Sequence, residues 1–146
     1  MCICGLSQNY ADCCGRFIEG ACTVETPEQL MRTRYVAFTQ ANADYVKATM
    51  AGKAAENFDL SNFTNWSKNC TWLPLMVLSS KQQGNKGTVE FETGYKDDSG
   101  SHFIHEISQF ERIDGRWYYT DGKHVPTQSN ESCPCGSGKK FKRCCK

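Results

Sequence analysis

The sequence predicts an α+β domain in which helices pack on a bent antiparallel sheet, with a small cysteine-rich module at each end. Two observations lead to this prediction. The spacing of apolar residues changes once along the chain, from steps of three and four residues to alternation. The same spacing of four cysteines also occurs at both ends. We expect an N-terminal module at 1–22, a central domain at 23–125, and a polar linker with a C-terminal module at 126–146.

The first half of the central domain carries the signals of helices. Thr26 is expected to cap a helix that has Pro27 in its first turn. Apolar residues then recur at steps of three and four residues from Leu30 to Ala41. We expect residues 42–44 to end this helix. Two shorter helical segments are predicted to follow, one over 45–50 that closes near Gly52 and one over 61–68 that buries Phe63 and Trp66.

From Trp72 onward the apolar residues form a continuous run or alternate with polar ones, which predicts strands. We expect one strand over 72–78, with Pro74 pushing its first half toward a sheet edge or a bulge. Residues 86–96 alternate and predict a strand with one buried face. The remaining predicted elements are a hairpin turn at 97–100, a strand over 101–113, a turn at Asp114-Gly115 and a strand over 116–120, with His124 in a following loop.

Eight of the ten cysteines form two sets with the spacing C-x-C-x8-C-C. Two close pairs separated by a short loop converge on one ion when the loop reverses the chain, and four sulfur ligands suit a tetrahedral Zn²⁺ site. Disulfides are the alternative, but they require an oxidising compartment, and iron is less favoured because nothing suggests redox work. We predict two Zn²⁺ ions, one bound by each of the sets Cys2, Cys4, Cys13, Cys14 and Cys133, Cys135, Cys144, Cys145.

The charge and hydropathy of the chain argue against bulk attraction to nucleic acid and against a membrane-spanning segment. The sequence has 17 basic and 16 acidic residues, a formal net charge of +1, so bulk attraction to nucleic acid is not expected. No apolar run approaches the roughly 20 residues that cross a bilayer. The first residues also lack the basic and apolar regions of a secretory leader. We therefore expect a soluble, cytoplasmic protein.

The C-terminal cysteines lie in the segment CPCGSGKKFKRCC, which resembles the SEC-C motif, the zinc knuckle at the C-terminus of the bacterial translocase motor SecA. The resemblance implies zinc binding, although Cys145 stands where the translocase motif commonly has His. The N-terminal segment CICGLSQNYADCC keeps every cysteine and Gly5, but it has no basic residue between Cys4 and Cys13. Because the negative charge of a zinc ion bound by four thiolates is then less compensated, we expect a weaker or differently tuned site at this end.

Further motifs of the central domain, held between the two knuckles, resemble the YchJ-like (UPF0225) family. They are RYxAF from Arg34, WLxLxVL from Trp72, the strand from Phe103 to Phe110, and DGRWxYxDG from Asp114. The resemblance covers nearly the whole chain and implies an NTF2-like or cystatin-like cone for the central domain. Members of the family are largely uncharacterised. The resemblance therefore implies a fold and zinc binding better than it implies an activity.

The concave sheet face of such a cone often holds a pocket, although a fold by itself assigns no function. His102, Glu106 and Ser108 share one side of a predicted strand, and with Tyr35 they are our candidates for a central pocket. His102 and Glu106 would lie about 13 Å apart along the strand, too far for a direct pair. The alternative is that Glu106 pairs with Arg34 and that His102 is solvated near the hairpin turn. We expect the large aromatic residues Trp66, Trp72, Phe91, Trp117 and Tyr119 to fill the core.

Three function classes remain. The favoured one is a non-catalytic zinc protein whose basic C-terminal knuckle binds an acidic chaperone or a ribosomal or translocation-linked partner, since the similar knuckle of the translocase motor contacts the export chaperone SecB. The second is a small-molecule binder or enzyme that uses the central cone, and the third is a nucleic-acid binder. Both zinc sites have four sulfur ligands and leave no position for water, so we predict no catalytic residues. The predicted contact surface is Lys139, Lys140, Phe141, Lys142 and Arg143.

Overall fold

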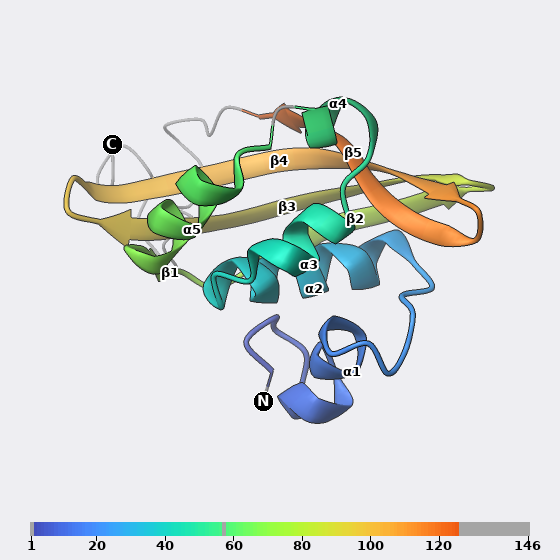
Figure 1. Cartoon of the computed structure of the whole chain (residues 1–146), viewed down its shortest axis with the longest axis horizontal. Helices are drawn as coiled ribbons and strands as arrows, with labels where there is room; N and C mark the ends of the chain where they lie inside the picture. The colour runs from blue at the N-terminus through green and yellow to red at the C-terminus, as the bar shows by residue number, and fades with distance from the viewer. Residues whose placement is uncertain (1, 57, 126–146) are drawn as a thin grey trace.

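The computed structural model describes residues 2–56 and 58–125, and it confirms the α+β fold class. One antiparallel sheet forms a curved layer, and helices cover one of its faces (Figure 1). The first helix, α1 (Gly15–Ile18), belongs to the N-terminal module and packs against the long helix α2 (Pro27–Thr39). Helix α2 is therefore contacted by the N-terminal module as well as by the sheet.

Helix α2 begins where the sequence predicts. The Thr26 side-chain oxygen accepts a hydrogen bond of 3.1 Å from the backbone N–H of Gln29, and Pro27 is the first helical residue. The helix ends at Thr39, short of the predicted end, because Ala41 adopts a left-handed φ of 53°. None of the helices in the described ranges is long and apolar enough to cross a membrane.

The helices after α2 differ from the prediction in two places. Asn42 caps α3. Residues 43–44, which we expected to lie in the break after the first helix, therefore form the first turn of α3. Asn favours this N-cap position although it disfavours helix interiors. Gly52 starts a helix, α4, that we did not predict, and α5 buries Phe63 but leaves Trp66 36% exposed. The helix bounds are α3 Ala43–Ala48, α4 Gly52–Glu56 and α5 Leu60–Lys68, and a 3₁₀ turn, η1, spans Tyr10–Asp12.

The centre of the sheet is an antiparallel meander that confirms the predicted hairpins. Strands β3 (Lys86–Asp97), β4 (Gly100–Ile113) and β5 (Arg116–His124) pair in chain order. The turn between β4 and β5 has φ values of 51° at Asp114 and 82° at Gly115. Positive φ at both central residues is the requirement of the type I′ hairpin turn, which explains the Asp-Gly pair.

The apolar run 72–78 is not one strand. It is divided between β1 (Thr71–Trp72) and β2 (Met76–Gln83), which both pair with β3 but at its two ends. Pro74 lies in the gap, because it has no N–H to donate to the ladder. Strand β2 then continues through polar residues that we did not assign, and its first residue, Met76, is 59% exposed. The apolar run therefore reflects a sheet edge and not a buried strand.

Strand β5 extends past its predicted end at Thr120 and reaches His124, so His124 lies in a strand and not in a loop. The Asp121-Gly122 pair has the composition of a turn, but Gly122 lies opposite Ser108 in the ladder with β4. A shift of register precedes this pairing, between Gln109 and Phe110 of β4. Tertiary pairing has here overridden a local turn signal.

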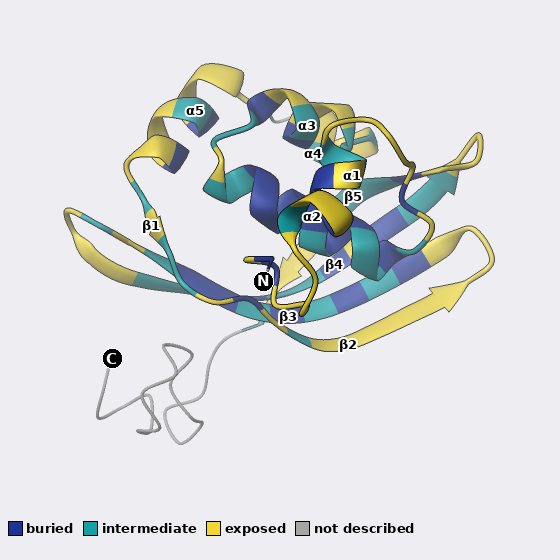
Figure 2. Cartoon of the chain, turned by 90° about the horizontal axis from the view of Figure 1, so that it is seen from below, coloured by how far each residue is buried: buried dark blue, intermediate teal, exposed yellow. Residues whose placement is uncertain are grey.

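The core lies between α2 and the middle of the sheet, where the buried segments in Figure 2 face one another. The hairpin between β3 and β4 projects beyond the helices, and most of β2 is exposed (Figure 2). The four N-terminal cysteines pack in the same apolar cluster as residues of α2 and the sheet. The N-terminal module and the central domain therefore share one continuous core. The cluster includes Leu30, Tyr35, Val89, Phe110 and Trp117.

Candidate functional site

The N-terminal cysteines form a candidate metal centre. Cys2, Cys4, Cys13 and Cys14 are each at most 4% exposed, and their sulfur atoms all lie within 4.8 Å of one another. The sulfur atoms of Cys4 and Cys13 are 3.6 Å apart. A tetrahedral site with Zn–S bonds of about 2.3 Å places its sulfurs roughly 3.8 Å apart. The donor set therefore fits a Zn²⁺ ion whose coordination is completed by protein sulfur.

Short backbone turns hold these cysteines together. The backbone N–H of Cys2 donates to the Gln8 carbonyl oxygen at 2.6 Å, and that of Cys13 donates to the Tyr10 carbonyl oxygen at 3.1 Å. Gly5 follows the first cysteine pair with a φ of 101°, a region that strains residues with a Cβ. The loop between the pairs thus makes the chain reversal that the cysteine spacing predicts.

The four sulfurs cannot all ionise without a cation. The hydrogen bond with Cys14 is the main reason that the pKa of Cys4 is lowered to about 5. Burial and the hydrogen bond to Cys4 raise the pKa of Cys13 to about 11, and the same hydrogen-bonded contact with Cys4 also raises the pKa of Cys14. One thiolate therefore suppresses ionisation of its neighbours. Four thiolates fit in this space only with a metal cation between them.

Two arginines bring positive charge to this centre from outside the cysteine loop. Arg32 of α2 donates from Nη1 to the Cys4 carbonyl oxygen at 2.7 Å and from Nε to the Glu28 carboxylate at 3.1 Å. Arg16 donates from Nε to the Cys13 carbonyl oxygen at 3.3 Å. Our expectation of less compensated charge considered only the residues between the cysteine pairs. It missed Arg32, which is distant in sequence and reaches the centre only through the fold.

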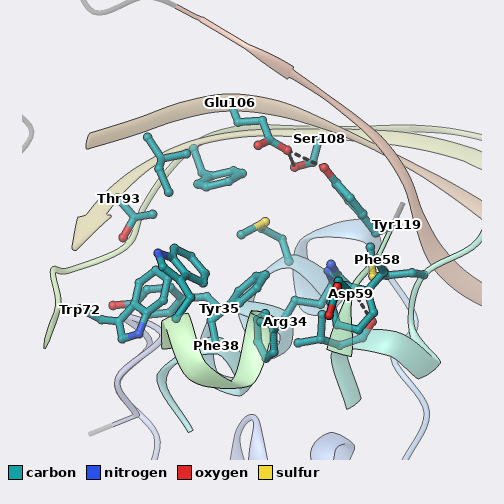
Figure 3. A pocket seen from close by; sticks show the side chains of 17 residues that line it. Arg34, Tyr35, Phe38, Phe58, Asp59, Trp72, Thr93, Glu106, Ser108 and Tyr119 are labelled. Carbon is teal, nitrogen blue, oxygen red and sulfur yellow. Dashed lines mark hydrogen bonds between the residues drawn. The ribbon is translucent and has the colours of Figure 1, made fainter. Parts of the chain in front are cut away.

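A cavity of about 310 Å³ lies between the concave face of the sheet and the helices (Figure 3). Strand β4 contributes Glu106 and Ser108 to one wall, and α2 contributes Arg34, Tyr35 and Phe38 to the opposite wall. Most of the remaining lining is apolar, which is typical of small-molecule sites. Its other aromatic residues include Phe58, Phe63, Trp66, Trp72 and Phe91.

The fold brings three of the four candidate pocket residues together and places the fourth elsewhere. Tyr35, Glu106 and Ser108 line the cavity, and the Tyr35 hydroxyl donates to the Leu73 carbonyl oxygen at 2.5 Å. His102 lies outside the lining, near the β3–β4 turn, with its side chain 40% exposed. Its Nε2 lies 3.1 Å from Asp97 Oδ1, and its ring stacks on another aromatic ring. The structure therefore agrees with the alternative, solvated position of His102.

Glu106 is held by neutral hydrogen-bond donors. The alternative that it pairs with Arg34 is wrong. Its Oε1 accepts hydrogen bonds from the Ser108 hydroxyl and the Tyr119 hydroxyl, both at 2.9 Å (Figure 3). Burial, followed by the charge of Glu106, raises the pKa of Tyr119, so its hydroxyl remains a donor at neutral pH. Gly122 lies against this group, and a Cβ there would meet both the carboxylate and the Tyr119 hydroxyl. A residue without a side chain is thus required opposite Ser108.

Arg34 is a buried cation in the opposite wall of the cavity. It is 4% exposed, and its Nη1 donates to the Val46 carbonyl oxygen at 2.9 Å and to Thr49 Oγ1 at 2.7 Å. Its Cζ lies 4.6 Å from the centroid of the Tyr119 ring, a cation–π contact. Burial lowers the pKa of Arg34 to about 10, which leaves it protonated at neutral pH.

The aromatic residues that we assigned to the core divide between two positions. Trp117 is 2% exposed and belongs to the main cluster, as expected. Phe91 belongs to that cluster as well, and Trp72 and Tyr119 pack against it, although these three residues and Trp66 also line the cavity. Apolar periodicity cannot separate these positions, because a side chain that faces a cavity and one that faces the core both point inward.

Comparison with known sequences settles the family. The model of the YchJ middle NTF2-like domain matches residues 26–122, and the SEC-C motif model matches residues 130–146. The chain belongs to the YchJ-like (UPF0225) family. A UPF0225 protein of Sodalis glossinidius is 40% identical over 148 residues, which cover 99% of this chain and 96% of the relative. The membership confirms the resemblance of the sequence motifs and the NTF2-like fold.

Two solved SEC-C motif proteins share the fold of this UPF0225 chain. The protein from Rhodopseudomonas palustris has a TM-score of 0.78 and 35% identity, covering 86% of this chain and 98% of its own. The protein from Psychrobacter arcticus has a TM-score of 0.69 and 32% identity, covering 97% and 89%. The C-terminal cysteines Cys133, Cys135, Cys144 and Cys145 and the basic surface of Lys139, Lys140, Phe141, Lys142 and Arg143 lie outside the described residues.

Proposed function

We propose that this chain is a non-catalytic zinc protein that uses its C-terminal SEC-C knuckle to bind a protein partner. The observation that carries the metal part is the N-terminal centre, where four buried sulfurs lie within 4.8 Å of one another. Four sulfur ligands complete a tetrahedral Zn²⁺ site and leave no position for a reacting water. The ion has a structural role, since its ligands belong to the same apolar cluster as α2.

The partner has an acidic surface, as an acidic export chaperone or a ribosomal or translocation-linked partner does. The support for this is the match of the SEC-C motif model to residues 130–146 and the run of basic residues from Lys139 to Arg143 within it. A second Zn²⁺ held by the four C-terminal cysteines would keep this basic segment in one conformation. The free cysteines of the N-terminal centre are consistent with a cytoplasmic location.

Metal stoichiometry tests the zinc part of the proposal. Elemental analysis and native mass spectrometry of protein purified without added metal should give two zinc ions per chain. The variant Cys14→Ser should retain one. A wild-type chain that holds one zinc ion, or iron in place of zinc, would contradict two structural zinc sites.

Charge reversal tests the partner part. The variant Lys139→Glu, Lys140→Glu, Lys142→Glu, Arg143→Glu should lose binding to purified SecB and to ribosomes while it keeps both zinc ions. Reversal of the exposed Lys47 and Lys68 in the central domain is the matched control and should leave binding unchanged. Binding that survives the fourfold reversal would place the interface elsewhere. Binding of the wild-type chain to unrelated single-stranded RNA, with a steep salt dependence, would favour nucleic acid as the partner.

A second candidate function is the binding of a small molecule in the central domain. The cavity of about 310 Å³ favours it, because an apolar cleft with a few fixed polar groups is the usual form of such sites. Ligand binding and zinc binding use separate residues, so the two functions are compatible.

A further inference from the structure

The central cavity is lined by one cation, Arg34, and by two anions, Glu106 and Asp59, and Arg34 and Glu106 lie on opposite walls without pairing. The Asp59 carboxylate accepts hydrogen bonds from Asn62 at the start of α5. Arg34 comes from α2 and Glu106 from β4 (Figure 3). Among the ion pairs of the described residues, each defined by a nitrogen–oxygen distance up to 4.0 Å, none includes Arg34 or Glu106. Both charges therefore face the same cavity without an ionic partner from the described part of the chain.

The hydrogen bonds of Arg34 leave part of its guanidinium available. Nη1 makes both of its contacts, to the Val46 carbonyl oxygen and to Thr49 Oγ1. Within residues 2–56 and 58–125, Nε and Nη2 have no acceptor, and neither is among the fully buried unsatisfied atoms. Arg34 lines the cavity, so these N–H groups are within reach of a molecule bound there. A buried guanidinium whose N–H groups lack an acceptor favours an acceptor in the cavity, because a buried charged donor that makes no hydrogen bond destabilises the protein.

Glu106 shows the complementary arrangement. Its Oε1 accepts from Ser108 and Tyr119, which fixes the carboxylate in one orientation. In the described ranges, Oε2 accepts no hydrogen bond, and Glu106 is half-buried in the lining of the cavity. Tyr119 touches both charges, since its ring lies under the Arg34 guanidinium and its hydroxyl binds Glu106. One end of the cavity thus offers a free donor and a free acceptor on either side of a tyrosine.

We propose that this cavity binds a small, uncharged aromatic molecule whose polar end carries both an acceptor and a donor, as a carboxamide does. The carbonyl oxygen accepts from the free nitrogens of Arg34, and the N–H group donates to Oε2 of Glu106. The ring packs among the aromatic side chains at the other end, which include Trp66 and Trp72, 5.3 Å apart between ring centroids. This proposal rests on the small-molecule function above and names its ligand class.

The charges of the lining, which are those of Arg34, Glu106 and Asp59, explain why the ligand is uncharged. A carboxylate would satisfy Arg34 but would meet the negative charge of Glu106, and an ammonium would meet the positive charge of Arg34. A charged ligand also loses its own hydration on entering an apolar cavity. The volume of about 310 Å³ is near the lower end of the range of small-molecule pockets and suits one or two fused rings.

Three probes that share one ring system test the ligand class. Binding of indole-3-acetamide, indole-3-acetate and tryptamine to the full chain at pH 7 is measured by calorimetry and by ligand-observed NMR. The amide is expected to bind at least about tenfold more tightly than either charged probe. Equal binding of all three probes, tighter binding of a charged probe, or no binding of the amide would overturn the proposal.

The variant Glu106→Gln tests the role of the carboxylate. It keeps an oxygen that can accept from Ser108 and Tyr119 but removes the negative charge, so the ratio of acetate to acetamide affinity should rise at least about tenfold. His102→Gln changes a residue of the same strand that lies outside the cavity and should leave the ratio unchanged. An unchanged ratio in Glu106→Gln overturns the assignment of Oε2.

A cavity-filling variant keeps the test valid if Glu106→Gln does not fold. Ile104→Phe adds a ring to the lining beside Glu106 and should abolish binding of the amide, with the zinc content and the fold retained. Full binding of the amide to this variant would place it outside the cavity and overturn the proposal. Zinc content is measured on every sample, so a failed ligand proposal is distinguished from a failed zinc proposal.

Discussion

The N-terminal cysteine centre and the central cavity both gather polar groups inside the protein, but they arrange them in opposite ways. In the cysteine centre four sulfurs converge within 4.8 Å, so one small cation satisfies all of them. In the cavity Arg34 and Glu106 lie on opposite walls, and each keeps an unused atom. Convergent groups close a site around an ion, whereas separated groups leave room for a molecule. The first region is therefore suited to stability and the second to recognition.

The largest effect is expected from breaking the convergent site. Cys14→Ser removes one of four ligands, so the N-terminal ion should be lost and the free energy of unfolding should fall by more than about 4 kcal/mol. Because the cysteines share the core with α2, the loss should reach the central domain and lower its melting temperature. Circular dichroism and zinc analysis measure the two effects.

The exposed Cys22 supplies the control for that experiment. Cys22→Ser lies outside the four-sulfur cluster and should change neither zinc content nor melting temperature. If Cys14→Ser loses zinc while the central domain melts as in the wild type, the shared core contributes little and the N-terminal module is energetically independent.

A smaller effect is expected from removing the buried cation. Arg34→Met keeps most of the side-chain volume but removes the hydrogen bonds to Val46 and Thr49 and the cation–π contact with Tyr119. We expect the free energy of unfolding in urea to fall by about 2–4 kcal/mol. The exposed Lys47→Met is the matched control and should change it by less than about 0.5 kcal/mol. If Arg34→Met lowers the free energy of unfolding as little as Lys47→Met does, the cost of burying the Arg34 charge equals the stabilisation from its hydrogen bonds and its cation–π contact.

The smallest effect concerns the tyrosine between the two charges. Tyr119→Phe removes one hydrogen bond to Glu106 and should lower the free energy of unfolding by about 1 kcal/mol at pH 7. Tyr118→Phe changes the neighbouring residue of β5, which makes no side-chain hydrogen bond in the described structure, and should have no effect. Equal losses in both variants would contradict a specific role of the Tyr119 hydroxyl.

The same pair of variants has a predicted dependence on pH. The pKa of Tyr119 is raised by burial, so the unfolded chain releases this proton first. Its stabilising contribution is complete below the ordinary tyrosine pKa of about 10 and is lost as the pH rises toward the raised value. The lowered pKa of Arg34 contributes with the opposite sign, so the test is the difference between variants. Above pH 10 the stability of Tyr119→Phe should fall less steeply than that of Tyr118→Phe.

The two regions also differ in how far the sequence predicts them. The cysteine centre is formed by residues 2–14, and its spacing alone indicates the chain reversal and the ligands. The cavity draws residues from Met31 to Tyr119 on separate helices and strands. Its members are brought together by pairing and packing that no short segment encodes. The same reason explains why Arg32 was not recognised as a charge of the cysteine centre and why Arg34 was considered only as an ionic partner of Glu106.

The errors in the fold prediction have a related cause. Alternation of apolar and polar residues identified β3, in which every second residue from Gly87 to Thr93 is buried. The prediction failed where local composition and tertiary contacts disagree, as in the split at Pro74 and the continuation of β5 through Gly122. The pocket assignment of His102 was wrong and its alternative, solvated position was right, because the side of a strand is predictable from the sequence, whereas the extent of the helical cover over that strand is not.

Helix α2 contacts both the N-terminal cysteine centre and the central cavity. Arg32 reaches the Cys4 carbonyl oxygen from this helix, and Arg34 and Tyr35, two and three residues further along it, line the cavity. A rotation or shift of α2 would therefore alter both regions at once. Thermodynamic reciprocity then imposes a strict condition on the molecule. Whatever factor a cavity ligand applies to the affinity for the N-terminal ion, the ion must apply to the affinity for that ligand.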